Sequence, residues 1–292
     1  PPGDAPLRRS LWPYVFIAPF LLGFLAFGVF PIAFSLWLSF TDWNGIAAPA
    51  WRGLANFRDA FGPSGRAFRD SMLNSALIAL LYVPVVTVLS LVVAMFLNDP
   101  RVRGFTAFRA MIFAPFVTSM IAAGMVFQLL LGPQGLVNGL LRAVGLEGLP
   151  WLDDPGLARV SLLFLLVWGN LGYNVVIMLA GLQAIPGEVV DAARVDGAGW
   201  WARLLLVILP MMRPVVLFST VFSVAGCFAL FNEVVALGRG PLDSNVTPLV
   251  VIYDTAFSSG LFGLASAQSY LYFLVILGLT VVQFRLIGRE RV

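Results

Sequence analysis

The chain has 292 residues, of which 60% are apolar and only 11% are charged. Its mean hydropathy is +0.91. Soluble globular proteins carry about 25% charged residues and are about half apolar, so the composition excludes a disordered chain and disfavours an ordinary soluble domain. The lipid bilayer therefore has to be considered as the solvent.

Three features of the composition restrict the chemistry. The chain has no His, which removes the usual general base at neutral pH and the commonest metal ligand. Its one Cys, Cys227, cannot form an internal disulfide or a multi-thiolate metal site. All basic residues are Arg, so a phosphate-binding loop of the Walker type is excluded as well. The net charge of +3 is divided among short loops, which argues against nucleic acid as a partner.

Six apolar stretches predict membrane-spanning helices, because about 20 apolar residues are needed to cross the roughly 30 Å hydrocarbon layer. The fifth is the shortest, and Asn232 and Glu233 interrupt any extension of it. The predicted spans are residues 12–38, 73–97, 110–131, 160–182, 214–231 and 264–284.

The positions of the Arg residues predict the orientation. With the N-terminus in the cytoplasm, eleven Arg residues fall on inner segments and seven on outer loops, which agrees with the positive-inside rule. Both termini are therefore predicted to be cytoplasmic. The first stretch is too long for the apolar region of a secretory signal, so we interpret it as a transmembrane helix with interfacial aromatic residues at both ends.

The inner segment 185–213, between the fourth and fifth spans, predicts two short helices. Pro186 suits a first helical position, Glu188 and Asp191 complement the N-terminal dipole, and Gly197 favours a left-handed stop. These signals predict a helix over 186–195. A second helix is expected over 199–209, where apolar residues recur at helical spacing until Pro210 ends it.

Three motifs of this segment resemble the EAA loop of permease subunits in ATP-binding-cassette (ABC) importers. They are Asp191-Ala192-Ala193, Asp196-Gly197-Ala198 and Ile208-Leu209-Pro210. Segments along nearly the whole chain resemble the carbohydrate-uptake branch, especially its maltose-type first permease: GLANF at 53–57, FRAMIFAP at 108–115, WLDDP at 151–155 and FNEVVALGRGP at 231–241. Asp191 stands where that family usually has Glu, and the large external insertion of the best-known maltose-type subunit is lacking.

The resemblance implies an all-α membrane protein of the type I importer fold, with one permease domain over 1–292 and a coupling loop over 185–213. It implies a second permease chain, two ATPase subunits that bind ATP and Mg, and an extracytoplasmic solute-binding protein, all at a prokaryotic cytoplasmic membrane. This chain itself would hold no cofactor, and its solute would be a sugar, an oligosaccharide or a polyol phosphate. The residues expected to couple to an ATPase are Glu188, Asp191, Ala192, Ala193, Asp196 and Gly197.

Polar residues at membrane depth are candidates for the translocation path, because such groups tend to face a bundle interior or a wet cavity. Hydrogen bonds that only hold helices together are the alternative for each of them. The candidates are Gln128, Asn170, Tyr173, Asn174, Ser223, Asn232 and Glu233.

Two other functions compete with an importer permease. A transporter that works without ATPases would need a buried proton relay, and none is evident. An intramembrane metal-dependent transferase would need converging carboxylates, yet Asp153 and Asp154 form an isolated pair on an outer loop. The chain carries no ATP-binding motif, so an importer of this kind would take its energy from a partner.

Overall fold

The protein is described by a computed structural model over residues 12–99 and 105–287. Within these ranges, six helical segments are long and apolar enough to cross a membrane. They are Tyr14–Leu38, Pro63–Leu97, Met120–Ala143, Pro155–Gln183, Trp200–Phe228 and Phe262–Leu286. The expected all-helical, six-span architecture is confirmed. Several of the Arg residues on which the predicted orientation depends lie outside the described residues. They are at positions 8, 9, 101, 103, 289 and 291.

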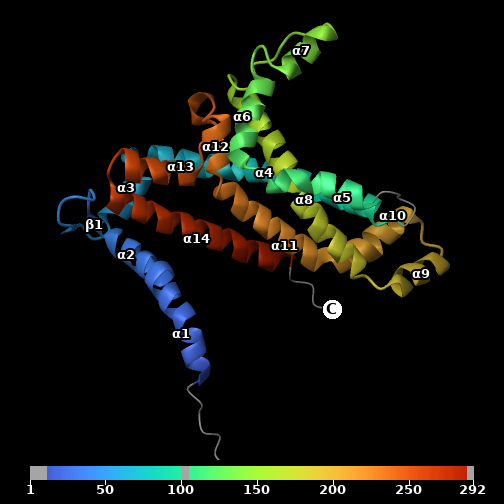
Figure 1. Ribbon diagram of the computed structural model, residues 1–292, viewed down its shortest axis with the longest axis horizontal. Helices are drawn as coiled ribbons and strands as arrows, with labels where there is room; N and C mark the ends of the chain where they lie inside the picture. Colours follow the sequence, from blue (N-terminus) through green and yellow to red (C-terminus); the bar gives the residue numbers. More distant parts are fainter. Residues whose placement is uncertain (1–11, 100–104, 288–292) are drawn as a thin grey trace, which may run out of the picture.

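Strands are confined to one short hairpin among the described residues, in which Thr41 pairs with Trp51 and Asp42 with Ala50. Figure 1 shows the helices in chain order, with η denoting 3-10 or π segments between them. The elements are α1 (Trp12–Phe24), η1 (Leu25–Val29), α2 (Phe30–Leu38), β1 (Thr41–Asp42), β2 (Ala50–Trp51), α3 (Ala55–Phe61), η2 (Pro63–Gly65), α4 (Arg66–Leu97), α5 (Phe105–Phe113), η3 (Ala114–Val117), α6 (Met120–Leu131), α7 (Leu136–Ala143), α8 (Pro155–Gln183), α9 (Gly187–Val195), α10 (Trp200–Arg203), η4 (Leu204–Ile208), α11 (Leu209–Phe228), α12 (Asn232–Leu237), η5 (Pro241–Asp243), α13 (Pro248–Tyr253), η6 (Asp254–Ser258) and α14 (Phe262–Ile287).

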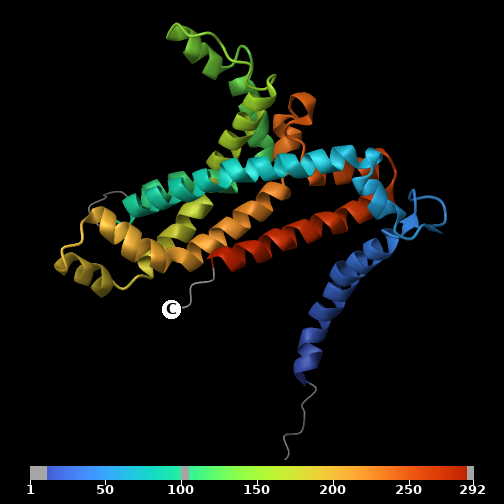
Figure 2. The same ribbon diagram turned by 180° about the vertical axis from the view of Figure 1, so that it is seen from behind.

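The first span stands apart from the other helices. Figures 1 and 2 show α1 and α2 pointing away from the bundle, and none of the residues in the apolar window of this span is buried. Its C-terminal end is held, where the Ser35 hydroxyl lies 3.2 Å from the Tyr270 hydroxyl on α14. The span therefore leaves a long apolar surface for lipid or another chain.

The core is built around α8, in whose apolar window half of the residues are buried. Helix α11 packs against α4, α8 and α14. One buried cluster includes Phe68, Leu162 and Leu165, and a second, towards the other end of the bundle, includes Met178 and Met212. Burial of these apolar side chains and their close packing fix how the spans sit against one another.

The third span departs from its predicted bounds of 110–131. The chain breaks at Thr118 and Ser119, which are extended, so α5 and α6 are separate helices and the spanning segment is Met120–Ala143. Pro115 lacks an N–H, and the Thr118 hydroxyl donates a 3.1 Å hydrogen bond to the Ala114 carbonyl. Pro115 donates no backbone hydrogen bond to the helix, and the Thr118 hydroxyl competes with backbone N–H groups for the Ala114 carbonyl. Both effects favour a break of the helix here.

The fifth span also differs from the predicted bounds of 214–231, and the separate helix predicted over 199–209 is wrong. The helix is continuous from Trp200 to Phe228, through both Pro210 and Pro214. A π segment, η4, precedes Pro210, and the N–H of Leu209 donates to the carbonyl of Leu204, five residues back. The wider turn makes room for a residue that donates no hydrogen bond, so Pro210 lies in the first turn of α11.

Candidate functional site

Helix α9 lies at the far end of the bundle, beside α10 (Figures 1 and 2). It has no buried residue, and Pro186 is its N-cap, so the helix begins at Gly187, one residue after the predicted start at Pro186. Glu188, Asp191, Ala192 and Asp196 are exposed, and Ala193 is half-buried. All six residues predicted for ATPase coupling lie on this helix or at its C-terminal end.

The C-terminal end of α9 is a Schellman turn. The N–H of Ala198 donates to the Ala193 carbonyl at 2.9 Å, and the N–H of Gly197 donates to the Arg194 carbonyl at 3.1 Å. Gly197 has a φ of +80°, a left-handed conformation that costs glycine little. No atom would contact a Cβ at this position, so the conformation alone requires glycine. The helix stop predicted at Gly197 is confirmed.

Asp191 has a partner within its own helix. Its Oδ1 accepts a 2.9 Å hydrogen bond from Nη1 of Arg194, one turn later, and both side chains are mostly exposed. An exposed ion pair at this spacing is worth only about 0.5 kcal/mol or less. A basic group on another protein would therefore have to displace Arg194, at little cost.

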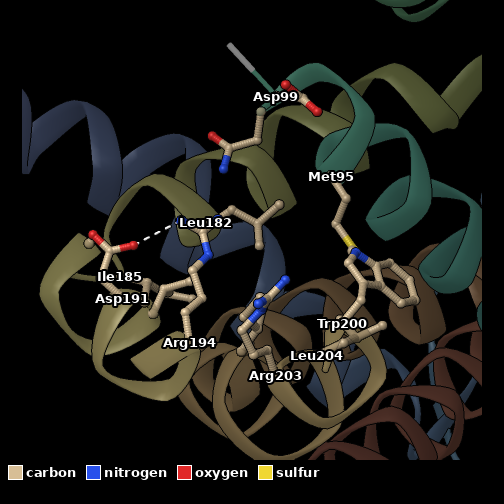
Figure 3. Close-up of a pocket in the computed structure, with 13 residues that line it drawn as sticks. Met95, Asp99, Leu182, Ile185, Asp191, Arg194, Trp200, Arg203 and Leu204 are labelled. Atoms are coloured by element: carbon tan, nitrogen blue, oxygen red, sulfur yellow. Dashed lines mark hydrogen bonds and ion pairs between the residues drawn. The ribbon is translucent and has the colours of Figure 1, made fainter. Parts of the chain in front are cut away.

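A cavity of about 720 Å³ separates α9 from the ends of α4 and α8 (Figure 3). Its charged lining includes Asp99, Asp191, Arg194 and Arg203, and Leu182, Ile185 and Leu204 supply apolar surface. The cavity and the absence of buried residues on α9 show that this helix is not embedded in the core.

A second cavity, of about 420 Å³, lies between α4, α8, α11 and the start of α12. Five of the seven residues predicted for the translocation path line it: Asn170, Tyr173, Asn174, Ser223 and Glu233. The other lining residues are Tyr82, Phe116, Leu166, Phe222, Gly226, Cys227, Ala229 and Leu230. We call this space the inner cavity. Its wall combines amides, hydroxyls and one carboxylate with aromatic rings.

The polar groups of the inner cavity differ in how far they are already paired. Asn174 is buried, its Oδ1 accepts a 2.7 Å hydrogen bond from Ser219, and its Nδ2 donates to the Asn170 carbonyl. Asn170 donates one hydrogen bond to the Leu166 carbonyl, one turn back in α8. The ring of Tyr173 stacks on Phe116, with the ring centroids 5.0 Å apart. Asn174 thus already joins α8 to α11, whereas Asn170 and Tyr173 have greater capacity to bind another molecule.

A third cavity, of about 470 Å³, adjoins the inner cavity where the chain leaves helical form between α11 and α12. Asn232 lines it together with Phe231, Tyr253 and Phe257. Ala229 and Glu233 line both cavities. We call this space the outer cavity. Asn232 and Glu233 were both predicted for the translocation path. Of the two, Glu233 lines both cavities and Asn232 lines the outer one.

Gln128 lines neither cavity. Its Nε2 donates a 2.9 Å hydrogen bond to the Leu237 carbonyl, which ties α6 to α12. These helices approach closely at Gly124, where a Cβ would lie 2.6 Å from the Cβ of Ala236. The position of Gln128 matches the alternative interpretation of polar span residues, an interhelical hydrogen bond.

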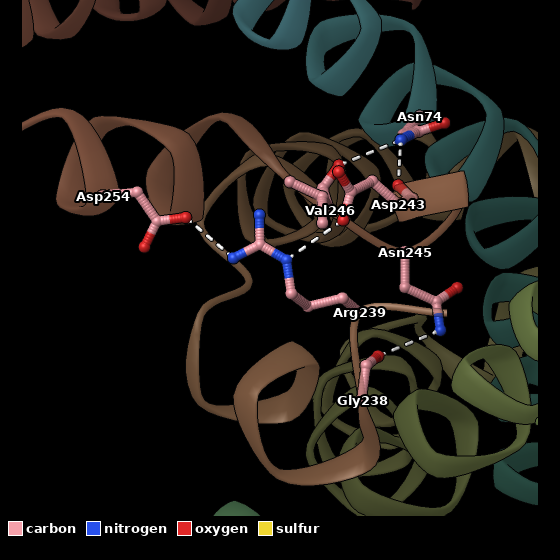
Figure 4. Close-up of polar contacts among 7 residues, drawn as sticks. All are labelled: Asn74, Gly238, Arg239, Asp243, Asn245, Val246 and Asp254. Atoms are coloured by element: carbon pink, nitrogen blue, oxygen red, sulfur yellow. Dashed lines mark hydrogen bonds and ion pairs between the residues drawn. The ribbon is translucent and has the colours of Figure 1, made fainter. Parts of the chain in front are cut away.

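The two segments predicted to lie outside are built by local hydrogen bonds. Asp154, of the isolated carboxylate pair, caps α8 by accepting from the N–H groups of Gly156 and Leu157 at 2.9 Å. In the other segment Arg239 donates to Asp254 at 2.7 Å and to Asp243 at 3.1 Å (Figure 4). The hydrogen bond with Asp254 is the largest cause of a raised pKa of the Arg239 guanidinium, against a lowering by burial.

The lining residues that sequence reasoning missed are mainly aromatic. Tyr82, Phe116 and Phe222 face the inner cavity, and Tyr253 and Phe257 face the outer one. Their sequence signal is weak, because the spans are apolar on all sides and no polar face shows which side of each helix turns inward. Cys227, set aside as a lone thiol, also lines the inner cavity. Within 12–99 and 105–287, no three His, Cys, Asp or Glu residues are grouped so that they could hold a metal ion.

Comparison with known proteins identifies relatives over almost the whole chain. Residues 64–289 match the family described as binding-protein-dependent transport system inner membrane component. A lactose transport system permease protein of Rhizobium radiobacter is 33% identical over 284 residues, covering 95% of this chain and 94% of the relative. An sn-glycerol-3-phosphate transport system permease protein of Pectobacterium atrosepticum is 30% identical over 292 residues, covering 98% and 97%.

The fold has a solved counterpart. A chain of a bacterial ABC transporter involved in the import of the acidic polysaccharide alginate superposes with a TM-score of 0.84 at 20% identity, over 98% of both chains. This likeness shows that the helices have the arrangement of a type I ABC importer permease. On the family match over 226 of its 292 residues, counted from 64 through 289, the chain belongs to the binding-protein-dependent transport system inner membrane components.

Proposed function

We propose that this chain is the permease subunit of a sugar importer and that the inner and outer cavities form its share of the translocation path. The observation that carries the proposal is the convergence of Asn170, Tyr173 and Glu233 on the wall of the inner cavity. Amide, phenol and carboxylate groups exchange hydrogen bonds with sugar hydroxyls, and aromatic faces pack on the apolar faces of sugar rings. The relatives named for lactose transport and for sn-glycerol-3-phosphate transport support a sugar or a polyol phosphate as the solute.

Coupling to ATP hydrolysis would pass through α9. This helix has no buried residue, and its small Ala192 side chain lets another surface approach the backbone closely. We expect α9 to seat in a cleft of an ATPase subunit, so that closure of the ATPases becomes rotation of the spans. The ATPases would bind ATP and Mg, and this chain would contribute no catalytic group of its own.

A second permease chain would complete the path. The apolar window of the first span has no buried residue, so this helix has a surface free for a neighbouring chain or for lipid. Solute would arrive from an extracytoplasmic binding protein, a kind of partner that appears in one of the similar structures, an alginate transporter with its substrate-bound periplasmic protein. With both termini in the cytoplasm, the segments around Trp151 and Arg239 would face that protein.

Reconstitution tests the proposal. The complete importer, with its second permease, ATPases and binding protein, is placed in liposomes, and ATP-dependent uptake of labelled sugars is measured. We expect uptake only with all components, and a large loss with Asn170→Ala and Tyr173→Ala together. Uptake by this chain alone without ATPases would contradict the proposal and support a secondary transporter. Unchanged uptake by the double variant would remove the inner cavity from the path.

A further inference from the structure

Glu233 is the single charged side chain that lines the two cavities of the proposed path within 12–99 and 105–287. The inner cavity is lined otherwise by apolar, amide, hydroxyl and thiol groups, and the outer cavity by apolar residues, Asn232 and Tyr253. Among the residues that the structure describes, no Arg lines either cavity, and the chain has no His. The fixed charge on this chain's part of the path is therefore negative.

The carboxylate of Glu233 is available to a solute. It forms no hydrogen bond or ion pair within the part of the chain that the structure describes, and its residue is only partly exposed. Arg239, six residues on, is already engaged by Asp243 and Asp254 (Figure 4). The nearest basic residue along the chain is thus neutralised by its own partners and does not offset Glu233.

Glu233 also occupies the junction between the two cavities. It lines both of them, as does Ala229, at the break between α11 and α12. Under the proposed function, a solute that passes from the outer to the inner cavity must pass this carboxylate. Aromatic rings flank the junction on each side. The ring centroids of Phe231 and Tyr253 are 5.1 Å apart, and those of Tyr173 and Phe222 are 6.4 Å apart.

We infer that Glu233 makes this path selective for uncharged sugars and excludes anionic ones. A carboxylate accepts hydrogen bonds from neighbouring sugar hydroxyls, which an uncharged sugar supplies without any charge of its own. A uronate or a sugar phosphate would bring a second negative charge close to Glu233, where no described Arg of this chain lines the wall to balance it and like charges repel. The inference rests on the proposed function. It restricts the solutes of the importer to neutral sugars and oligosaccharides and excludes polyol phosphates.

Thiol labelling measures the charge of the junction directly. The variant Ala229→Cys in a Cys227→Ser background places the chain's one thiol at the junction, and the complete importer is labelled during ATP turnover with its binding protein. Three methanethiosulfonates are compared: one neutral, one carrying a trimethylammonium and one carrying a sulfonate. We expect the cationic reagent to react about tenfold faster than the anionic one, after correction for their intrinsic rates. Adding Glu233→Gln should reduce this ratio to about one.

A control thiol at Val144→Cys, in the same background, lies on an exposed residue after α7 and lines neither cavity. Its ratio should not change with Glu233→Gln. An equal rate for the anionic and cationic reagents at position 229, or a ratio that Glu233→Gln leaves unchanged, would overturn the inference.

Protection by solute separates this inference from the proposed function. If transported solute slows labelling of the 229 thiol but the charge ratio is absent, the path stands and the charge selection fails. If the thiol reacts with no reagent, or solute never protects it, the position is not on an aqueous path and both proposals fail.

Discussion

The hydroxyl of Ser219 donates a 2.7 Å hydrogen bond to Oδ1 of Asn174, which joins α11 to α8 in the buried part of the bundle. Hydrogen bonds between helices in membranes contribute about 0.6 kcal/mol on average. The bond connects two helices that both line the inner cavity. Asn174 is thus tied into the packing of the wall, although it was predicted for the path.

The first prediction separates stability from transport at this wall. Asn174→Ala and Ser219→Ala should each lower the stability of the purified protein by about 0.6 kcal/mol, and the double variant should lose less than the sum, because each single variant already removes the same bond. Thermal unfolding in detergent measures this. Asn170→Ala is the control, because its amide bonds only within α8 and its loss should affect uptake more than stability. Strictly additive losses would contradict a direct bond between Asn174 and Ser219.

The second prediction concerns the left-handed residue after α9. Gly197→Ala should cost about 1 to 2 kcal/mol locally, because an L-residue is strained at a φ of +80°. Transport-coupled ATP hydrolysis of the complete importer should fall, and Gly197→Asn should restore part of it, since Asn tolerates this conformation. Gly199→Ala is a matched control, because Gly199 has a φ of −63° and also has open space at its Cβ. Equal effects at 197 and 199 would show that backbone conformation is not the cause.

The third prediction concerns the ion pair on α9. Asp191→Ala should change stability by less than about 0.5 kcal/mol, because the pair with Arg194 is exposed. If an ATPase subunit uses the carboxylate, Asp191→Ala should lower coupled hydrolysis and Arg194→Ala should not, since it only frees Asp191. The measurements are transport-coupled ATP hydrolysis by the complete importer and co-purification of the ATPase with each variant. A larger loss with Arg194→Ala would assign the contact to Arg194.

The fourth prediction concerns Arg239, which bridges Asp243 and Asp254. Arg239→Gln should lower stability by about 1 kcal/mol, a modest value because all three side chains are at least a third exposed. The pKa of Arg239 is raised in the folded protein, chiefly by the hydrogen bond with Asp254. A basic group with a raised pKa stabilises fully below its unfolded pKa, so titration of Arg239 should add no pH dependence between about pH 5 and about pH 9. Thermal unfolding of the unchanged protein and of Arg239→Gln across that range tests this. If the difference in stability between the two proteins disappears at about pH 9, the prediction is contradicted.

The spans could be predicted from the sequence because length and hydropathy alone require them. The helix stop at Gly197 could be predicted because glycine adopts a left-handed turn at the least cost. The break at Thr118 and the continuity through Pro210 could not, because each depends on how one backbone segment redistributes its hydrogen bonds: a hydroxyl donor at Thr118 and a π segment before Pro210. A proline lies at both places, but only the segment after Pro115 is interrupted.

The candidate site was predictable to a similar extent. Polar residues within spans or just after them are rare enough to single out Asn170 and Glu233, and the structure places both on the inner cavity. The division into two cavities was not predictable, because it arises from the turn between α11 and α12 and from aromatic side chains on α4, η3, α11, α13 and η6. The sequence also could not show that Asn174 and Gln128 already have partners, since those partners lie 45 and 109 residues away.

The fifth prediction concerns the close approach of α6 and α12, which supports the segment that carries Glu233. Gly124→Ala would place a Cβ 2.6 Å from the Cβ of buried Ala236 and 3.1 Å from its carbonyl carbon. The helices must separate, which should cost about 1 to 3 kcal/mol and strain the hydrogen bond from Gln128 to Leu237. Gly139→Ala in α7 is the control, because nothing lies within 4 Å of its Cβ. Adding Ala236→Gly should recover part of the thermal stability but not all, because the backbone of Ala236 still lies close. Full stability of Gly124→Ala, or no recovery in the double variant, would contradict the direct contact of these two helices.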